Sequence, residues 1–159
     1  MRIIAVILPI NNPDILKQSD LEPYQSNDVN FRLSYVDTQL REINTAEEAE
    51  VLLPLVVKKI QEAEHEGADA VIVYAFAEFG VTETEDIVKI PVMALGKAAI
   101  HEARNLSSKK FTVLPGMLAH NEFLKTMIET EKLGDNYVPA IHSPEVTPAE
   151  IRKDQTILK

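Results

Sequence analysis

The chain has 159 residues, of which 45% are apolar and 26% charged, and its formal net charge is -9. This is ordinary globular composition, long enough for one domain or two small lobes, and it has no basic patch suited to nucleic acid. The sequence contains no cysteine, which excludes disulfides and thiol chemistry and favours a cytoplasmic protein.

Apolar strand patterns alternate with helical patterns, which predicts an α/β fold with mostly parallel sheets. The first strand is expected at residues 3–8, in an apolar run that Pro9 interrupts and that is too short to cross a membrane. Asn12 followed by Pro13 predicts a short helix at residues 14–18. Residues 31–36 alternate in polarity and predict the second strand.

A long helix is expected from Thr45 to about residue 65, because Thr45 and Glu48 have the spacing of a capping box. Its inward side has a 3.6-residue period. That side consists of Ala49, Leu52, Leu53, Val56, Val57, Ile60 and Ala63. Pro54 lies inside the pattern, where proline costs about 3 kcal/mol, so a kink is expected there. Gly67 ends the helix.

The third strand is expected at residues 70–74. Thr82 and Glu85 repeat the capping-box spacing and predict a short helix, followed by a strand at residues 90–94 and a helix at residues 96–104.

A fifth strand at residues 111–114, a helix at residues 120–132 and a sixth strand at residues 137–141 complete the alternation. Residues 147–150, Thr-Pro-Ala-Glu, predict the start of a last helix.

Residues 67–80, Gly-Ala-Asp-Ala-Val-Ile-Val-Tyr-Ala-Phe-Ala-Glu-Phe-Gly, are the most informative stretch. A run of β-branched residues ends in small residues, a carboxylate and a glycine. This predicts a buried parallel strand that leads into a tight turn at the carboxyl edge of a sheet, where α/β proteins bind ligands.

The same stretch resembles the aspartate/glutamate/hydantoin racemase family, and most closely its hydantoin racemase branch. Leu-Pro-Ile-Asn-Asn at residues 8–12 is similar to the family's amino-terminal Asn-Pro-Asn turn. Ile-Pro-Val at 90–92, Gly-Lys-Ala-Ala at 96–99 and Lys-Phe-Thr-Val at 110–113 are similar to its later segments in the same order. The resemblance therefore covers nearly the whole chain.

The resemblance implies two pseudo-repeated flavodoxin-like lobes, each of which contributes one cysteine to a shared cleft. We expect a first α/β lobe at residues 1–105 and a partial second lobe at residues 106–159. The segment around Pro9 is similar to that around Pro115, and the spacing from Pro9 to Ala75, applied to Pro115, falls beyond residue 159. The second lobe is therefore expected to be incomplete, although loose repetition is also common in unrelated α/β chains.

Ala75 occupies the position of the family's first cysteine. Racemisation without a cofactor removes a proton beside a carbonyl and returns one from the opposite face, so it requires two acid/base groups. Alanine has no transferable proton, and the two-thiol route is excluded for this chain. Glu78 and His120 are the alternative candidate proton carriers. The non-catalytic interpretation of Glu78 is an acidic side chain in a turn that is exposed to solvent.

The part of the cleft that recognises substrate is still expected, because turns after strands present backbone N–H groups to carboxylate or imide oxygens. The predicted substrate-binding residues are Pro9, Asn11, Asn12, Ala75, Phe76, Ala77, Pro115 and Gly116. Asn12 has the alternative role of a helix cap, and Gly116 that of a turn glycine. The histidines lack metal-ligand spacing, so we predict neither a metal nor a cofactor.

Three functions remain open at this point. The first is a racemase-family protein, cofactor-independent by descent but without two-cysteine activity. The second is a non-catalytic small-acid-binding or assembly protein. The third is a cysteine-independent isomerase or lyase that uses Glu78 or His120. The expected partners are a small carboxylate or imide and further copies of the same chain, with no nucleic acid and no membrane.

Overall fold

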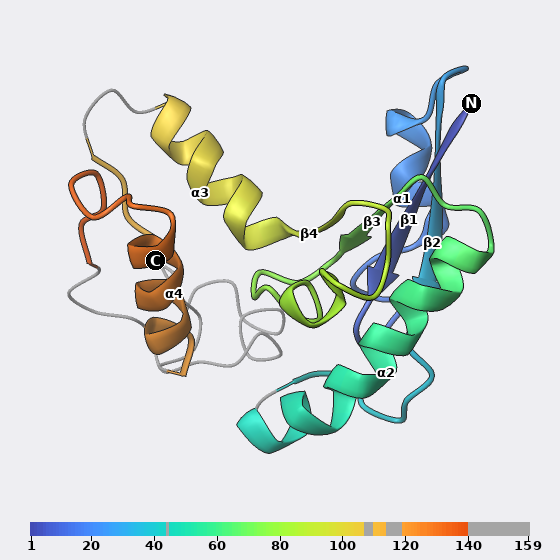
Figure 1. Cartoon of the computed structure of the whole chain (residues 1–159), viewed down its shortest axis with the longest axis horizontal. Helices are drawn as coiled ribbons and strands as arrows, with labels where there is room; N and C mark the ends of the chain where they lie inside the picture. Colours follow the sequence, from blue (N-terminus) through green and yellow to red (C-terminus); the bar gives the residue numbers. More distant parts are fainter. Residues whose placement is uncertain (44, 107–109, 114–118, 140–159) are drawn as a thin grey trace. The chain divides into compact units, whose positions relative to one another are not determined.

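The structure is a computed structural model that describes residues 1–43, 45–106, 110–113 and 119–139. The chain divides into two compact units, Met1–Ala98 and Ala99–Lys159, and Figure 1 shows the elements in sequence colours. The strands are β1 (Arg2–Leu8), β2 (Val29–Tyr35), β3 (Ala70–Val73) and β4 (Val92–Ala94). The α-helices are α1 (Gln18–Leu21), α2 (Ala46–His65), α3 (Leu95–Leu106) and α4 (Ala119–Thr130), and two short 3-10 helices are η1 (Glu22–Tyr24) and η2 (Thr82–Thr84).

The first unit contains one four-stranded sheet in the order β2-β1-β3-β4. All three strand pairs are parallel. In the register, Ile4 lies between Phe31 of β2 and Ala70 of β3. The predicted α/β class with a parallel sheet is therefore confirmed, and β1 and β3 are the two inner strands.

Helix α2 covers one face of this sheet, and its inward side was predicted correctly. Leu52, Val56, Ile60 and Ala63 are buried on it, in one cluster with Ile7 of β1 and with residues of β3. Thr45 caps the helix as expected: the Glu48 N–H donates to the Thr45 hydroxyl, and the Thr45 N–H donates to the Glu48 carboxylate, each over 3.2 Å. Pro54 lies inside the continuous helix.

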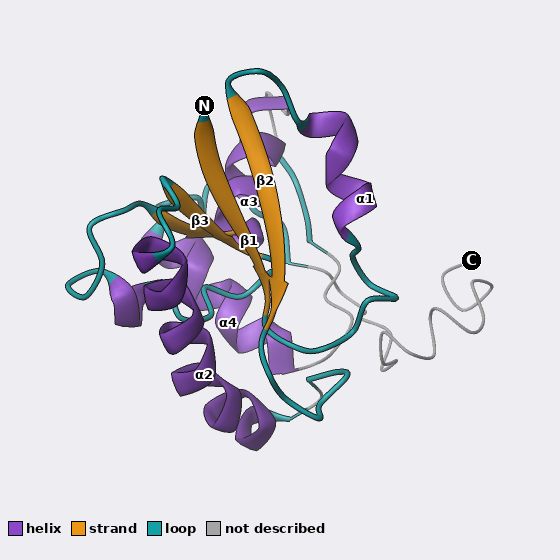
Figure 2. Ribbon diagram, turned by 90° about the vertical axis from the view of Figure 1, so that its right-hand side faces the viewer, coloured by secondary structure: helices purple, strands orange, loops and turns teal. Residues whose placement is uncertain are grey.

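Backbone groups on the outer edge of β2 are hydrogen-bonded to a side chain of α1. The Gln18 amide nitrogen donates to the Phe31 carbonyl over 2.8 Å, and the Leu33 N–H donates to the Gln18 amide oxygen over 2.7 Å. On the same side the Tyr35 hydroxyl donates to the Leu16 carbonyl over 2.7 Å. Figure 2 shows α1 and α2 on opposite sides of the β1–β2 pair.

Two local predictions are wrong. Residues 13–15 form turns and the first helix begins only at Gln18, because the Asn12 side chain accepts the N–H of Asp14 in a tight local turn. Thr82 is not a cap but the first residue of η2. Thr84 instead is buried, and its hydroxyl donates to the carbonyls of Gly80 and Val81 over 2.7 and 2.9 Å.

The second unit, where described, has its own apolar cluster of Ile100, Phe111, Leu124, Met127, Ile128 and Leu133. The fifth and sixth strands were expected to begin at Phe111 and Tyr137, and these two residues form an isolated parallel bridge. Leu114 and residues 140–150, including the start of the predicted last helix, lie outside the described residues. The compact units divide after Ala98, whereas the sequence analysis placed the lobe boundary after residue 105, and the lobe assignment stays a prediction.

Candidate functional site

Three strand ends define the candidate site in the first unit. β1 ends at Leu8, β3 at Val73 and β4 at Ala94. Because these strands are parallel, their carboxyl ends lie at the same edge of the sheet. The turns that follow them hold six of the eight predicted substrate-binding residues.

The turn after β1 is fixed by a buried asparagine. Pro9 is buried, Asn11 is exposed, and Asn12 is only 4% exposed. The Asn12 amide nitrogen donates to the Arg41 carbonyl over 2.9 Å, and its oxygen accepts from the Arg41 guanidinium over 3.0 Å. The Asn12 side chain thus ties this turn to the segment after β2, while Asn11 presents its side chain to solvent.

The turn after β3 carries the position that the family resemblance assigns to a cysteine. Ala75 is half-buried, and its carbonyl accepts the N–H of Leu95 over 2.9 Å. Phe76 is 37% exposed, and the N–H of Phe79 donates to the carbonyl of Ala77 over 2.7 Å. The turn after β3 is therefore bonded directly to the start of α3.

Glu78 brings the one acidic side chain into this turn. The residue is half-buried, and its Oε1 atom has almost no contact with solvent. Its backbone carbonyl accepts the N–H of Val81 over 3.1 Å. The buried Oε1 atom differs from the non-catalytic interpretation of Glu78, in which the carboxylate is fully exposed to solvent.

Gly96 makes the closest approach at the site. A Cβ atom on this residue would lie 1.9 Å from the Phe76 carbonyl oxygen, far inside any permitted contact. The absence of a side chain at Gly96 therefore lets the turn after β3 pack against the first turn of α3.

The remaining predicted residues are not placed at this edge by the structure. Pro115 and Gly116 lie outside the described residues, and His120 lies in α4 with its side chain undescribed. Within the described residues, no three acidic or histidine side chains form a group that could hold a metal ion. No helix in the described part of the chain is long and apolar enough to span a membrane.

Sequence reasoning missed Arg41 and the packing role of Gly96. Arg41 lies in an irregular segment, and its guanidinium also pairs with Asp14 over 2.8 Å, for which no sequence spacing gives a signal. Gly96 stands just after a strand that ends at Ala94. A glycine in that position is a recognisable signal of close backbone approach.

The sequence matches the family model described as Asp/Glu/Hydantoin racemase over residues 33–157. The chain belongs to the Asp/Glu/hydantoin racemase family. The match includes the turn after β3 and the start of α3, and it confirms the family resemblance. A comparison with curated proteins gave no match.

Solved structures with the same fold include two proteins named as allantoin racemases. The one from Klebsiella pneumoniae has a TM-score of 0.84 at 12% identity, and the match covers 99% of this chain and 64% of that one. The one from Pseudomonas fluorescens has a TM-score of 0.76 at 12% identity, with 98% and 66% covered. This chain thus spans just under two thirds of the length of both.

A mutant of arylmalonate decarboxylase in its liganded form also shares the fold. Its TM-score is 0.66 at 17% identity, and the match covers 99% of this chain and 69% of that one. Proteins named as racemases and as a decarboxylase therefore share this fold. The fold alone does not identify the reaction, which has to be argued from the site residues.

Proposed function

We propose that this racemase-family chain binds a small carboxylate or imide at the carboxyl edge of β1, β3 and β4, and that it does not racemise it by the two-thiol route. The observation that carries the proposal is Ala75 in the turn after β3, in a sequence without cysteine. The turn that would position the thiol is present, but the side chain of residue 75 is a methyl group.

Recognition is supported by the geometry of the edge. The Leu95 N–H is already bonded to the Ala75 carbonyl. The next N–H groups in the first turn of α3 have no partner within the helix and carry the positive end of its dipole, which favours an anionic or carbonyl oxygen. Asn11 adds an exposed amide at the end of β1, next to the buried Asn12 that holds the turn. The exposed ring of Phe76 offers an apolar surface for the carbon skeleton of a ligand.

The test combines ligand binding with proton exchange. Allantoin, a 5-substituted hydantoin and glutamate are each titrated against the purified chain in a thermal-unfolding assay. A ligand of this site at one hundred times its Kd stabilises the native state by about 2.7 kcal/mol. Parallel incubation in deuterated water, read by NMR and chiral chromatography, is expected to show no exchange of the α-hydrogen and no racemisation.

Asn11→Ala is expected to weaken the thermal shift, whereas Asn105→Ala, which removes another exposed asparagine at the far end of α3, leaves it unchanged. Racemisation by the purified chain at a rate that scales with its concentration contradicts the proposal. So does the absence of any thermal shift with all three compounds.

A second function is favoured by the covered Oε1 atom of Glu78. A carboxylate with one oxygen shielded from water, in the turn after β3, is suited to act as a general base, which would make this chain a cysteine-independent isomerase or lyase. Deuterium exchange that Glu78→Gln abolishes while the thermal shift persists would select this function over simple binding.

Ala75→Cys tests the assignment of the turn itself. One thiol on one face of the ligand is expected to exchange the α-hydrogen with retention of configuration, because inversion requires a second proton carrier on the other face. Ala77→Cys places a thiol in the same turn as the control and is expected to give no exchange.

A further inference from the structure

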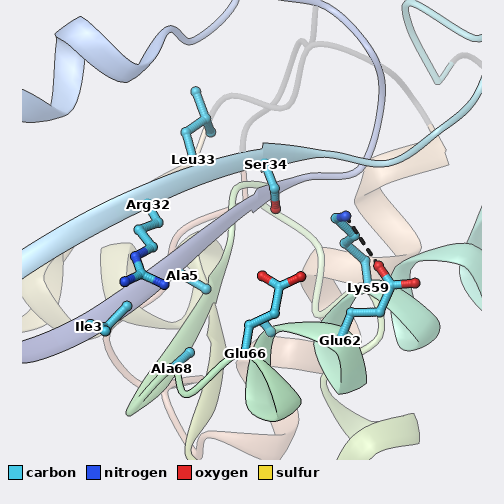
Figure 3. Close-up of a pocket in the computed structure, with 10 residues that line it drawn as sticks. Ile3, Ala5, Arg32, Leu33, Ser34, Lys59, Glu62, Glu66 and Ala68 are labelled. Atoms are coloured by element: carbon cyan, nitrogen blue, oxygen red, sulfur yellow. Dashed lines mark hydrogen bonds and ion pairs between the residues drawn. The ribbon is translucent and has the colours of Figure 1, made fainter.

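A groove of about 170 Å³ lies between β2 and the carboxyl-terminal half of α2, inside the first unit (Figure 3). Its floor consists of Ile3, Ala5, Ala63 and Ala68. Three of these are alanines, whose methyl groups leave the space unfilled. Ile3 lies near the amino-terminal end of β1, and Ala68 lies two residues before β3 begins. This floor is therefore separate from the carboxyl edge described above.

Charged side chains of both signs line the groove. Arg32 and Ser34 come from β2, Lys59 and Glu62 come from α2, and Glu66 directly follows that helix. A single-sign lining would select a simple anion or cation. A mixed lining on two facing elements instead selects a ligand that carries both charges.

Lys59 and Glu62 already form an ion pair with each other. The Lys59 ammonium lies 3.2 Å from the Glu62 carboxylate, and the hydrogen bond from Lys59 lowers the pKa of Glu62 below its ordinary value of 4.5. In Figure 3 this pair stands at one end of the groove, and Arg32 stands at the other.

Arg32 and Glu66 remain as one positive and one negative charge. Among the described residues, the Arg32 guanidinium and the Glu66 carboxylate make no hydrogen bond or ion pair. Figure 3 shows the Glu66 carboxylate and the Ser34 hydroxyl pointing toward one another across the space. The groove thus offers a planar five-donor cation, a hydroxyl group and a carboxylate, with an apolar floor between them.

We propose that this groove binds a small zwitterion of the free α-amino acid class. The ligand carboxylate is bound by Arg32 with Ser34, and the ligand ammonium by Glu66. Arg–carboxylate pairs are bidentate and directional, which fixes the orientation of the ligand. The site lies away from the racemase-type edge, so it is a second, non-catalytic site whose existence does not depend on the function proposed above.

The volume indicates the size of ligand that the groove can enclose. At about 30 Å³ for each water in the liquid, 170 Å³ holds roughly six water molecules, and alanine has six non-hydrogen atoms. Pockets for drug-sized ligands are larger, at about 300–1,000 Å³. Glycine and alanine fit within this volume, whereas the ring of an aromatic amino acid would extend out of it into solvent.

The experiment is a titration followed by ¹H–¹⁵N NMR with L-alanine, N-acetyl-L-alanine and L-alaninamide at millimolar concentrations. N-acetyl-L-alanine lacks the ammonium group, and L-alaninamide lacks the carboxylate. We expect L-alanine to shift the backbone signals of Ser34, Lys59 and Glu66 in a saturable way. Each of the other two compounds is expected to bind about tenfold more weakly or worse, because each leaves either Arg32 or Glu66 without the charged group that it would pair with.

Arg32→Gln and Glu66→Gln are each expected to weaken L-alanine binding about tenfold. Both residues are exposed, so the variants keep the fold, which the melting temperature of the free variants verifies. The matched controls are Arg2→Gln on β1 and Glu50→Gln on α2, which remove the same exposed charges outside the groove and are expected to bind like the parent chain.

Equal binding of all three compounds, or unchanged L-alanine binding by both groove variants, overturns the proposal. So does the absence of saturable shifts. Shifts confined to residues 76–78 and 95–97 that survive Arg32→Gln also overturn it, and they instead support ligand binding at the carboxyl edge. The two proposals therefore fail on different signals.

Discussion

Gly96→Ala probes the contact that holds the turn after β3 against α3. Alanine normally stabilises a helix interior by about 1 kcal/mol relative to glycine. Here the new Cβ would lie 1.9 Å from the Phe76 carbonyl oxygen. That oxygen is backbone, and the adjacent Ala75 carbonyl is bonded to Leu95 over 2.9 Å, so neither side can move without breaking the turn. We expect a loss of about 3 kcal/mol, at the upper end for overpacking.

Thermal unfolding followed by circular dichroism measures this loss. For a chain of this size 1 kcal/mol corresponds to about 2–4 °C, so the melting temperature should fall by about 6–12 °C. Two other glycines separate the causes. Gly134→Ala has no atom within 4 Å of the new Cβ and should change stability little. Gly67→Ala is equally open but has φ +83°, so it should cost about 1–2 kcal/mol from backbone strain alone.

The same variants test the link between the turn and the ligand edge. Gly96→Ala should also reduce the thermal shift produced by a ligand at the carboxyl edge, whereas Gly67→Ala, at the other end of β3, should preserve it. If Gly96→Ala leaves the melting temperature unchanged or raises it, then the close approach of the two backbones is wrong and the geometry derived for the site fails with it.

Asn12→Ala removes a buried amide that bonds Arg41 in two ways and is expected to cost about 2–3 kcal/mol in urea unfolding; a loss below 0.5 kcal/mol would contradict the anchoring role of Asn12. Thr45→Ala removes the cap of α2 and is expected to cost about 1 kcal/mol, with Thr45→Ser as the control that keeps the hydroxyl. The pKa of Glu62 is lowered by Lys59 in the folded chain, so this pair contributes stability above the ordinary pKa of 4.5, and the contribution disappears as the pH falls through the lower folded value. Comparing Lys59→Met with the parent chain should therefore show a stability difference at pH 7 that vanishes in acid, and a difference that persists at low pH would assign it to packing instead.

The regular elements of the first unit follow directly from the sequence. The β-branched runs and the apolar period of α2 are strong local signals, and the capping box of Thr45 forms as its spacing predicts. The residue pattern of 67–80 located the turn after β3, and the family resemblance assigned Ala75 within it to the position of a cysteine. These features depend on residues close together in the chain.

The errors and omissions arise where distant segments decide the outcome. Asn12 was expected to cap a helix at residues 14–18, but its amide is bonded to Arg41, 29 positions away. The charged groove combines β2 with α2, and no motif marks Arg32 and Glu66 as neighbours. Predictions for Pro115, Gly116 and His120 stay predictions, because the structure does not describe their side chains.

The Gln18 amide on the rim of β2 has a consequence for assembly. A parallel sheet with a bare outer strand invites a fifth strand from another molecule. Here the Phe31 carbonyl and the Leu33 N–H are already hydrogen-bonded to the Gln18 side chain of the same protomer. Self-association by continuing the sheet past this strand would first have to dislodge that glutamine, so a homo-oligomer of this chain is expected to join through surfaces other than this one.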